Sequence, residues 1–398
     1  MYDCAFLTPF EPRKTRLSHF RLSLMSPDPL IDVRSLSKSY RVHKRSPGLG
    51  AALRSVLHRK YELVKAVEDL SFQIGEGERV GFLGPNGAGK TTTLKVLAGL
   101  LHPTSGAVRV GSYVPQDRDP RFLQLITLVM GQKQQLLWDL PPSETYAMNR
   151  AIYDIPRAQA DETVRALVEL LEIGDLIDKP TRQLSLGERM KCELVAALLH
   201  RPRVLFLDEP TIGLDVSMQA KMRDFIRDYN ERFGAAVLLT SHYMDDVVAL
   251  CPRVVVIDHG RLIYDGDLQE LARRVRPDKR LTVRLSRAVD RADLEKLGTV
   301  VSSNAAQAVL SVPHARLQAV VRDALAALPI VDLTIEEAPL EEVMRELFGA
   351  QAKTTRAREQ AQATQAKPTE AQATQVKDAP AEDTPAQEAE ARDDRAHE

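Results

Sequence analysis

The 398-residue chain has few cysteines, almost no net charge and no long apolar run. Its three cysteines, Cys4, Cys192 and Cys251, form no CxxC pair, so we expect neither a disulfide framework nor a zinc site, and the thiols suit a reducing cytoplasm. The net charge of −1 gives no long-range field for nucleic acid, and none is expected as a partner. No apolar run reaches the roughly 20 residues that cross a bilayer, and the N-terminus lacks a signal-peptide pattern. We therefore expect a chain that neither spans a membrane nor is exported.

The apolar pattern predicts an α/β domain over residues 30–272, a small α+β domain over 275–349 and a tail over 350–398. In the first domain, the apolar runs VLFLDEP and AAVLLTS indicate strands buried on both faces of a parallel sheet. RVVVIDHGRLIYDG predicts a hairpin, and residues 143–200 are mostly helical in pattern. In the second, RLTVRL, VVSSNAAQAVLSV and IVDLTIEEA predict strands between helices. The tail has no aromatic residue and a composition typical of disorder.

Two further segments lie near the N-terminus. Residues 1–29 show no period and are expected to form a loose arm, of which 1–24, ahead of Met25, is expected to be either dispensable or not translated. The predicted strands LIDVRSLSKSYRV and AVEDLSFQI enclose a basic insertion over 41–62. Its core, GAALRSVLHRKYEL, has apolar residues at helical spacing and predicts a helix. This insertion could lie against a membrane surface or a partner, or could be a solvated charged helix.

A glycine-rich loop, GPNGAGKT, fits the pattern G-x-x-x-x-G-K-[ST] between the strand RVGFLG and the helix TTLKVLAGLL. Its glycines let backbone N–H groups surround phosphate oxygens at the positive end of the helix dipole. Lys90 is expected to reach the β- and γ-phosphates of ATP, and the Thr91 hydroxyl to coordinate Mg²⁺. The expected nucleotide contacts are Gly84, Pro85, Asn86, Gly87, Ala88, Gly89, Lys90, Thr91 and Thr92. A chance match is the alternative, and the strand-loop-helix context argues against it.

The buried strand VLFLDEP ends in two carboxylates, Asp208 and Glu209. Ligands of parallel α/β sheets bind at the carboxyl ends of strands. Asp208 is therefore expected to hold Mg²⁺, and Glu209 to accept a proton from the attacking water as a general base. The alternative is an Asp-Glu pair that caps a helix or starts a turn.

Three further motifs narrow the family. The segment LSLGER, residues 184–189, resembles the LSGGQ signature of ABC ATPases. Gly213-Leu214-Asp215 resembles the D-loop, and Thr240-Ser241-His242 resembles the switch-histidine strand. With the phosphate loop and the acidic strand end, they stand in family order over roughly residues 30–270. VMGQKQQLLWDLP, RQLSLGERMKCELVAALLHRP and the basic insertion resemble the sodium-export and drug-resistance subgroup of ATP-binding subunits, which work with ABC-2 class membrane subunits.

The resemblance implies a P-loop NTPase core of the ABC ATPase type, with an antiparallel β subdomain, a helical subdomain and a small C-terminal α+β domain. It also implies that Ser185, Gly187, Glu188 and Asp215 contact nucleotide bound by another subunit. The signature departs from the family pattern, since Leu186 replaces a glycine and Glu188 a glutamine. Asp215 could also cap the helix that follows it.

The resemblance assigns the remaining site residues with alternatives. His242 is expected to contact the γ-phosphate, unless it is a plain surface histidine. Gln132, 42 residues after Lys90, is the preferred Q-loop residue, reaching metal and water, and Gln134 is the second choice. Tyr113-Val-Pro-Gln116 looks similar but lies only 26 residues after Lys90. Gly131 before Gln132 is a local departure.

Tyr40 stands at the position of the A-loop aromatic, whose ring would stack on adenine. The alternative is a strand-end tyrosine packed on the core. Trp138, the only tryptophan, lies just beyond the expected Q-loop. In this family that segment lines the groove that receives a membrane subunit, so Trp138 is expected either to anchor that interface or to lie in the core of the helical subdomain.

The resemblance also implies an assembly. The chain holds one ABC domain, so it is expected to pair with a second copy of itself or with a related ATPase. ABC-2 type permease subunits are the expected membrane partners, which would hold the chain at the cytoplasmic face of the cell membrane and use ATP-driven dimer closure for export. The alternative is a soluble ABC ATPase in translation or DNA repair.

Overall fold

The computed structural model describes residues 28–43, 61–131 and 135–349. The expected tail, nearly all of the expected arm, most of the basic insertion, and both Gln132 and Gln134 lie outside the described residues. The chain divides into two compact units, Met1–Pro277 and Asp278–Glu398, and each is described by itself. Within the described ranges, none of the helices has the length and apolar character needed to cross a membrane.

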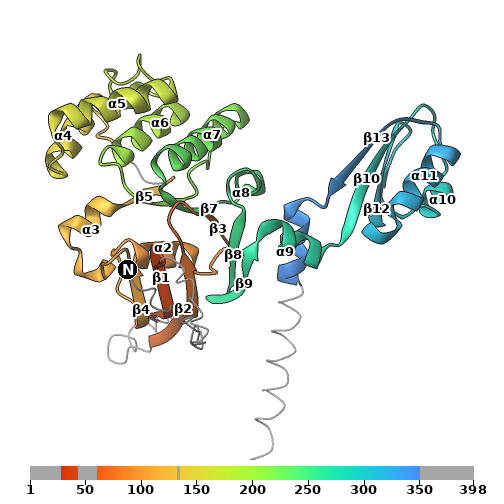
Figure 1. Ribbon diagram of the computed structural model, residues 1–398, viewed down its shortest axis with the longest axis horizontal. Coiled ribbons are helices and arrows are strands. Elements are labelled where there is room, and N and C mark those ends of the chain that lie inside the picture. The colour runs from red at the N-terminus through yellow and green to blue at the C-terminus, as the bar shows by residue number, and fades with distance from the viewer. Residues whose placement is uncertain (1–27, 44–60, 132–134, 350–398) are drawn as a thin grey trace, which may run out of the picture. The chain divides into compact units, whose positions relative to one another are not determined.

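The first unit is built on a six-stranded sheet (Figure 1). In spatial order its strands are β5 (Ile126–Met130), β6 (Val204–Asp208), β7 (Ala236–Thr240), β3 (Arg79–Leu83), β8 (Arg253–Asp258) and β9 (Arg261–Asp267). Neighbours are parallel except for β8 and β9, which form the predicted antiparallel hairpin. β6 and β7 are almost wholly buried, which confirms the prediction from their apolar runs. The parallel strands bring their carboxyl ends to one edge of the sheet.

A second, antiparallel sheet has the order β2-β1-β4, with β1 spanning Ile31–His43, β2 Tyr61–Ile74 and β4 Ser105–Val110. The predicted helix over the basic insertion is wrong for residues 61–63, which belong to β2. There Leu63 pairs with Arg41 and Tyr61 with His43, so the hairpin ladder takes the backbone hydrogen bonds that a helix would need.

One apolar core joins the two sheets through helix α2 (Lys90–Leu97). Phe72 of β2 and Phe82 of β3 lie with ring centroids 5.7 Å apart, and Leu94 of α2 is fully buried in the same cluster. This packing fixes the start of α2 against both sheets, and the phosphate loop lies at that point.

The other α-helices that the structure describes in this unit lie between the strands or after them. They are α3 (Pro120–Leu125), α4 (Pro142–Ile152), α5 (Arg157–Leu171), α6 (Leu186–Leu198), α7 (Val216–Phe233), α8 (Met244–Leu250) and α9 (Leu268–Val275). In Figure 1, α4, α5 and α6 gather at one end of the unit, and β1, β2 and β4 at the opposite end. The helical pattern predicted over 143–200 is confirmed.

The second unit is a four-stranded antiparallel sheet of order β11-β12-β10-β13, with two helices between its strands. Its elements are β10 (Asp278–Leu285), α10 (Arg291–Glu295), β11 (Thr299–Ser303), β12 (Gln307–Pro313), α11 (Leu317–Ala327) and β13 (Ile330–Glu337), and residues 340–349 are helical. The single strand predicted from VVSSNAAQAVLSV is wrong, because the chain turns back within it. The Asn304 side chain accepts hydrogen bonds from the backbone N–H groups of Ala306 and Gln307, which favours a turn over an extended strand.

Candidate nucleotide site

The phosphate loop connects β3 to α2 and is shaped by glycines that other backbone segments crowd. Gly89 has φ of 103°, and a Cβ there would lie 2.4 Å from the Ala66 carbonyl oxygen. A Cβ on Gly84 would lie 2.3 Å from the Ile257 carbonyl oxygen. The loop is therefore held between β2 and the end of β8, and neither glycine tolerates a side chain.

Lys90, the first residue of α2, turns back over this loop. Its Nζ donates to the carbonyl oxygens of Gly84 at 2.7 Å and Pro85 at 3.1 Å, and only 8% of the residue is exposed. Burial lowers the pKa of Lys90, while the nearby carboxylates of Glu209 and Asp208 act in the opposite direction. The loop thus holds a poorly solvated ammonium group, which suits a ligand with several negative oxygens.

Asp208 ends β6 and is oriented by two hydroxyl groups. Thr91 Oγ1 donates to Asp208 Oδ2 at 2.9 Å, and Thr240 Oγ1 donates to Oδ1 at 2.7 Å. Thr240 is fully buried at the end of β7, beside Asp208 in the strand register. Sequence reasoning placed Thr240 in the switch-histidine motif but missed its bond to Asp208, because a threonine at the end of an apolar strand carries no signal of its partner.

Glu209 and His242 follow neighbouring strands and face each other. His242 Nε2 lies 2.8 Å from Glu209 Oε1, and the Glu209 side chain is 19% exposed. Glu209 has φ of 56°, in the left-handed region, and its N–H donates to the Thr240 carbonyl oxygen at 3.0 Å. The bend that follows β6 therefore directs the carboxylate toward the loop that carries His242.

The start of the segment that carries the expected Q-loop is described up to Gly131. Gly131 N–H donates to the Asp208 carbonyl oxygen at 3.0 Å, and a Cβ on Gly131 would lie 2.1 Å from the Glu209 carbonyl oxygen. The glycine that departs from the family pattern therefore permits a contact of two backbones. Gln116, the less favoured alternative, donates instead to the carbonyl oxygens of Val96 and Leu101 near the end of α2.

The signature residues form the start of α6. Ser185 is its N-cap: the Ser185 Oγ accepts from Glu188 N–H at 3.3 Å, and Glu188 Oε2 accepts from Ser185 N–H at 2.8 Å. These bonds to Ser185 lower the pKa of Glu188. The glutamate that replaces the family glutamine is thus engaged in a capping box, and its carboxylate serves the helix terminus.

The D-loop lies against the signature within the same chain. A Cβ on Gly213 would lie 3.0 Å from Leu186 Cδ2, and one on Gly187 would lie 3.1 Å from Met218 Cγ. The larger Leu186 therefore covers the D-loop glycine. Asp215 caps α7, accepting from Met218 N–H at 3.0 Å, as the alternative for this residue expected.

The other expected nucleotide contacts lie in β1, in the phosphate loop and in the first turn of α2. Tyr40 lies in β1, opposite Val64 of β2, and Lys38 Nζ is 5.3 Å from its ring centroid. Tyr40 is half-buried, and Thr92 lies in the first turn of α2. Pro85, Asn86, Gly87 and Ala88 form the middle of the phosphate loop.

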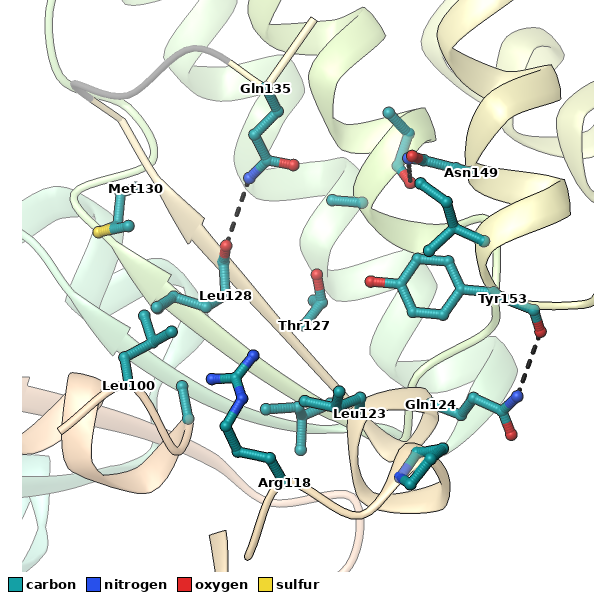
Figure 2. A pocket seen from close by; sticks show the side chains of 16 residues that line it. Leu100, Arg118, Leu123, Gln124, Thr127, Leu128, Met130, Gln135, Asn149 and Tyr153 are labelled. Carbon is teal, nitrogen blue, oxygen red and sulfur yellow. Dashed lines mark hydrogen bonds between the residues drawn. The ribbon is translucent and has the colours of Figure 1, made fainter. Parts of the chain in front are cut away.

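A cavity of about 430 Å³ opens between α3, β5 and α4 (Figure 2). Leu123, Leu128 and Met130 line it, and Tyr153 contributes a ring at its wall, stacked on His200 with ring centroids 4.1 Å apart. Gln124 and Gln135 donate to backbone carbonyls across this space in Figure 2. We name this cavity the α3–α4 groove; nothing in the sequence pattern singled it out.

Trp138 follows on the same connection between β5 and α4. Half of the residue, 50%, is exposed, and its neighbours Leu137 and Leu140 are each 43% exposed. The backbone holds the segment in place, since Arg182 N–H donates to the Trp138 carbonyl oxygen at 3.0 Å. The structure thus places the tryptophan ring at the surface.

The parallel sheet, the phosphate loop and the acidic strand end define the unit as a P-loop NTPase. Comparisons with known proteins give the family. The family model described as "ABC transporter" matches residues 67–212, and that of "EvrA-like ABC transporter, C-terminal domain" matches 277–336. The chain is 34% identical over 212 residues to the ABC transporter ATP-binding protein NatA of Bacillus subtilis (strain 168), covering 53% of this chain and 86% of NatA.

A longer match extends beyond the nucleotide-binding region. The chain is 31% identical over 317 residues to the daunorubicin/doxorubicin resistance ATP-binding protein DrrA of Streptomyces peucetius, covering 77% of this chain and 95% of DrrA. A solved structure of an ATP-binding subunit of an ABC transporter has the same fold, with a TM-score of 0.52 and 24% identity over 62% of this chain and 92% of that chain. The chain belongs to the ATP-binding proteins of ABC transporters, and it is an ATPase.

Proposed function

We propose that the chain hydrolyses MgATP to drive a separate ABC-2 type permease. The observation that carries this proposal is the convergence, at one sheet edge, of a buried ammonium, a hydroxyl-oriented carboxylate and a second carboxylate 2.8 Å from a histidine. Those groups are Lys90, Asp208, Glu209 and His242. The chemistry of Lys90 suits phosphate binding, that of Asp208 suits cation binding, and that of Glu209 beside His242 suits proton acceptance.

The phosphate loop and Asp208 divide the binding work. Lys90, which now donates to loop carbonyls, is the group that would donate to the β- and γ-phosphates. Thr91, Asp208 and Gln132 would hold Mg²⁺, whose carboxylate and hydroxyl oxygen ligands are of the type this ion prefers. When bound, the ion neutralises phosphate charge. Tyr40 would stack on the adenine ring from β1.

Glu209 is the proposed general base. Its partly buried carboxylate would accept a proton from the water that attacks the γ-phosphate. His242, in contact with Glu209, would contact the γ-phosphate and hold the carboxylate in place. Gln132 would complete this set by orienting the water.

We propose that the site is completed by a second copy of the chain, in a two-fold head-to-tail dimer, or by a related ATPase. Ser185, Gly187 and Asp215 would then approach nucleotide bound to the other copy. Glu188 would contribute through the capping box, which presents the Ser185 N-cap and the first N–H groups of α6.

The α3–α4 groove and the exposed Trp138 are the proposed docking surface for the permease. The groove is lined by apolar side chains together with polar ones such as Arg118, Gln124 and Gln135. Leu137, Trp138 and Leu140, which follow Gln135 in the chain, add exposed apolar side chains. Apolar anchors of this kind dominate protein interfaces. Docking would hold the chain at the cytoplasmic face of the membrane. The names of NatA and DrrA speak of a transporter and of drug resistance, which favours export over the alternative of a soluble ATPase in translation or DNA repair.

The test is to purify the chain with its membrane partners from a cell that expresses it, to identify those partners and to measure ATP hydrolysis. Recovery of a membrane protein with an ABC-2 type arrangement, together with Mg²⁺-dependent ATPase activity, is the expected result. Recovery with ribosomes or DNA, and without a membrane protein, would contradict the proposal.

A further inference from the structure

A fully buried carboxylate, Asp246, lies behind the catalytic edge and makes three side-chain hydrogen bonds. It is on α8 and 0% exposed. Asp246 Oδ2 accepts from Thr211 Oγ1 at 2.5 Å and from Ser241 Oγ at 2.8 Å, and Oδ1 accepts from Arg223 Nη1 of α7 at 2.9 Å. A buried charge with a paired cation and two hydroxyl donors is well satisfied, so its position is strongly determined.

Each hydroxyl belongs to one of the two loops that form the glutamate–histidine pair. Ser241 precedes His242, and its Oγ also accepts from Tyr243 N–H at 3.0 Å, so it shapes the loop around the histidine. Thr211 lies two residues after Glu209, and its carbonyl oxygen accepts from Leu214 N–H in the D-loop at 3.2 Å. Asp246 is therefore the common acceptor of the Glu209 loop and the His242 loop.

We propose that Asp246 is a positioning residue that sets the relative placement of Glu209 and His242 through Thr211 and Ser241, with Arg223 as its counterion. This inference rests on the proposed roles of Glu209 and His242. The 2.8 Å contact between them joins side chains on two separate loops. Thr240 ties the two strand ends together ahead of these loops, and beyond the strand ends Asp246 accepts a hydrogen bond from each loop. Loss of one hydroxyl would release one loop and leave the nucleotide contacts of the phosphate loop in place.

The first test removes one of the two hydroxyl groups at a time in the full-length chain. Ser241→Ala and Thr211→Val should each lower the turnover number by about tenfold, a fraction of the roughly 10²- to 10⁴-fold that a positioned base contributes. The KM for MgATP should stay within about twofold, because an interaction needed only in the transition state is lost. Ser241→Thr, which keeps the hydroxyl, should restore turnover. Thr145→Val is the matched control, since the buried Thr145 hydroxyl has no hydrogen-bond partner in the described part of the chain.

The second test is a double-mutant cycle. If Ser241 acts through His242, then Ser241→Ala should have no further effect on the residual turnover of His242→Ala, whereas independent effects would multiply. A merely structural role would lower turnover by the same factor in both backgrounds and would overturn the inference. So would Ser241→Ala and Thr211→Val variants that turn over at the wild-type rate.

Two outcomes separate this inference from the proposal that it rests on. Full turnover in Glu209→Gln or His242→Ala would refute the proposed function itself. If those variants are inactive while Ser241→Ala and Thr211→Val are normal, the catalytic assignment stands and only the positioning role fails. Asp246→Asn should lower turnover by at least as much as Ser241→Ala and Thr211→Val together. If this charge change prevents folding, the two hydroxyl variants still test the positioning role.

Discussion

Thr91 Oγ1 and Asp208 Oδ2, which are 117 positions apart in the sequence, lie 2.9 Å apart as donor and acceptor. The bond joins the first turn of α2 to the end of β6. Thr240 fixes the other oxygen of the same carboxylate. The Asp208 side chain is therefore oriented by its own protein neighbours.

Thr240→Val should weaken the response to Mg²⁺ while leaving the fold intact. The change removes the donor to Asp208 Oδ1 and the acceptor of a second Glu209 N–H bond, and it preserves side-chain shape. Loss of a group that orients a metal ligand typically weakens metal affinity by about tenfold or more. ATPase titrations with Mg²⁺ should show a half-saturating concentration raised by about that factor, against Thr145→Val as control. An unchanged Mg²⁺ titration would show that Thr240 is irrelevant to the cation.

Glu209→Gln should preserve ATP binding and nearly abolish hydrolysis, because the amide cannot accept the proton and the phosphate-loop contacts are untouched. The ATP-bound dimer should then accumulate on size-exclusion chromatography with ATP and Mg²⁺. Near-normal turnover would remove Glu209 from the mechanism.

Lys90→Ala should fail at an earlier stage, at nucleotide affinity. The variant loses the ammonium that the loop holds against Gly84 and Pro85 and that is expected to contact the β- and γ-phosphates. Titration with a fluorescent ATP analogue should show a Kd raised by at least about tenfold, as loss of a charge-assisted hydrogen bond implies. Wild-type affinity together with wild-type turnover would refute the phosphate-loop assignment.

Gly131→Ala should disturb the site through the backbone. A Cβ there would lie 2.1 Å from the Glu209 carbonyl oxygen, so β5 or the Glu209 bend must move. We expect a lower melting temperature and a loss of turnover, since overpacking of this kind costs about 1 to 3 kcal/mol. Gly174→Ala is the control, because a Cβ at Gly174 would meet nothing within 4 Å. Equal behaviour of the two variants would contradict the close contact.

Trp138→Ala should separate docking from stability. Because the tryptophan is 50% exposed, the isolated chain should keep its melting temperature and its basal ATPase activity, while co-purification with the permease should fall. Leu262→Ala, at a residue 37% exposed on β9, is the control. A drop in melting temperature matching a core truncation of roughly 3 to 5 kcal/mol would favour the core interpretation instead.

The parts of the fold that depend on local pattern could be predicted. The apolar runs of β6 and β7 and the glycine-rich loop carry their own signals, because burial on both faces and phosphate binding each require a distinctive composition. The extension of β2 to Tyr61 could not be predicted, since its strand character comes from pairing with β1. The turn at Asn304 was missed because the surrounding residues favour a strand. The hydrogen bonds that the Asn304 side chain accepts stabilise the turn instead.

The site shows the same division. The motif residues were found by spacing, whereas the roles of Thr240 and Asp246 depend on partners 32 and 35 positions away, Asp208 and Thr211. Hydroxyl groups at strand ends and aspartates in first helical turns are both common, so only the folded arrangement distinguishes these residues. The surplus Gly131 was visible in the sequence. The need for a glycine there comes from the Glu209 carbonyl oxygen, which lies too close for a side chain.

The contact between Gly131 and the Glu209 carbonyl oxygen is made by main-chain atoms, and substitutions of the Glu209 side chain leave it in place. A displacement of the end of β5 by the proposed permease would therefore still reach the peptide of residue 209 in a hydrolysis-deficient variant. Such a variant would not hydrolyse ATP, but it would keep the backbone contact that links β5 to residue 209. It could be used to measure how far a permease displaces the ATP-binding subunit when no ATP is hydrolysed.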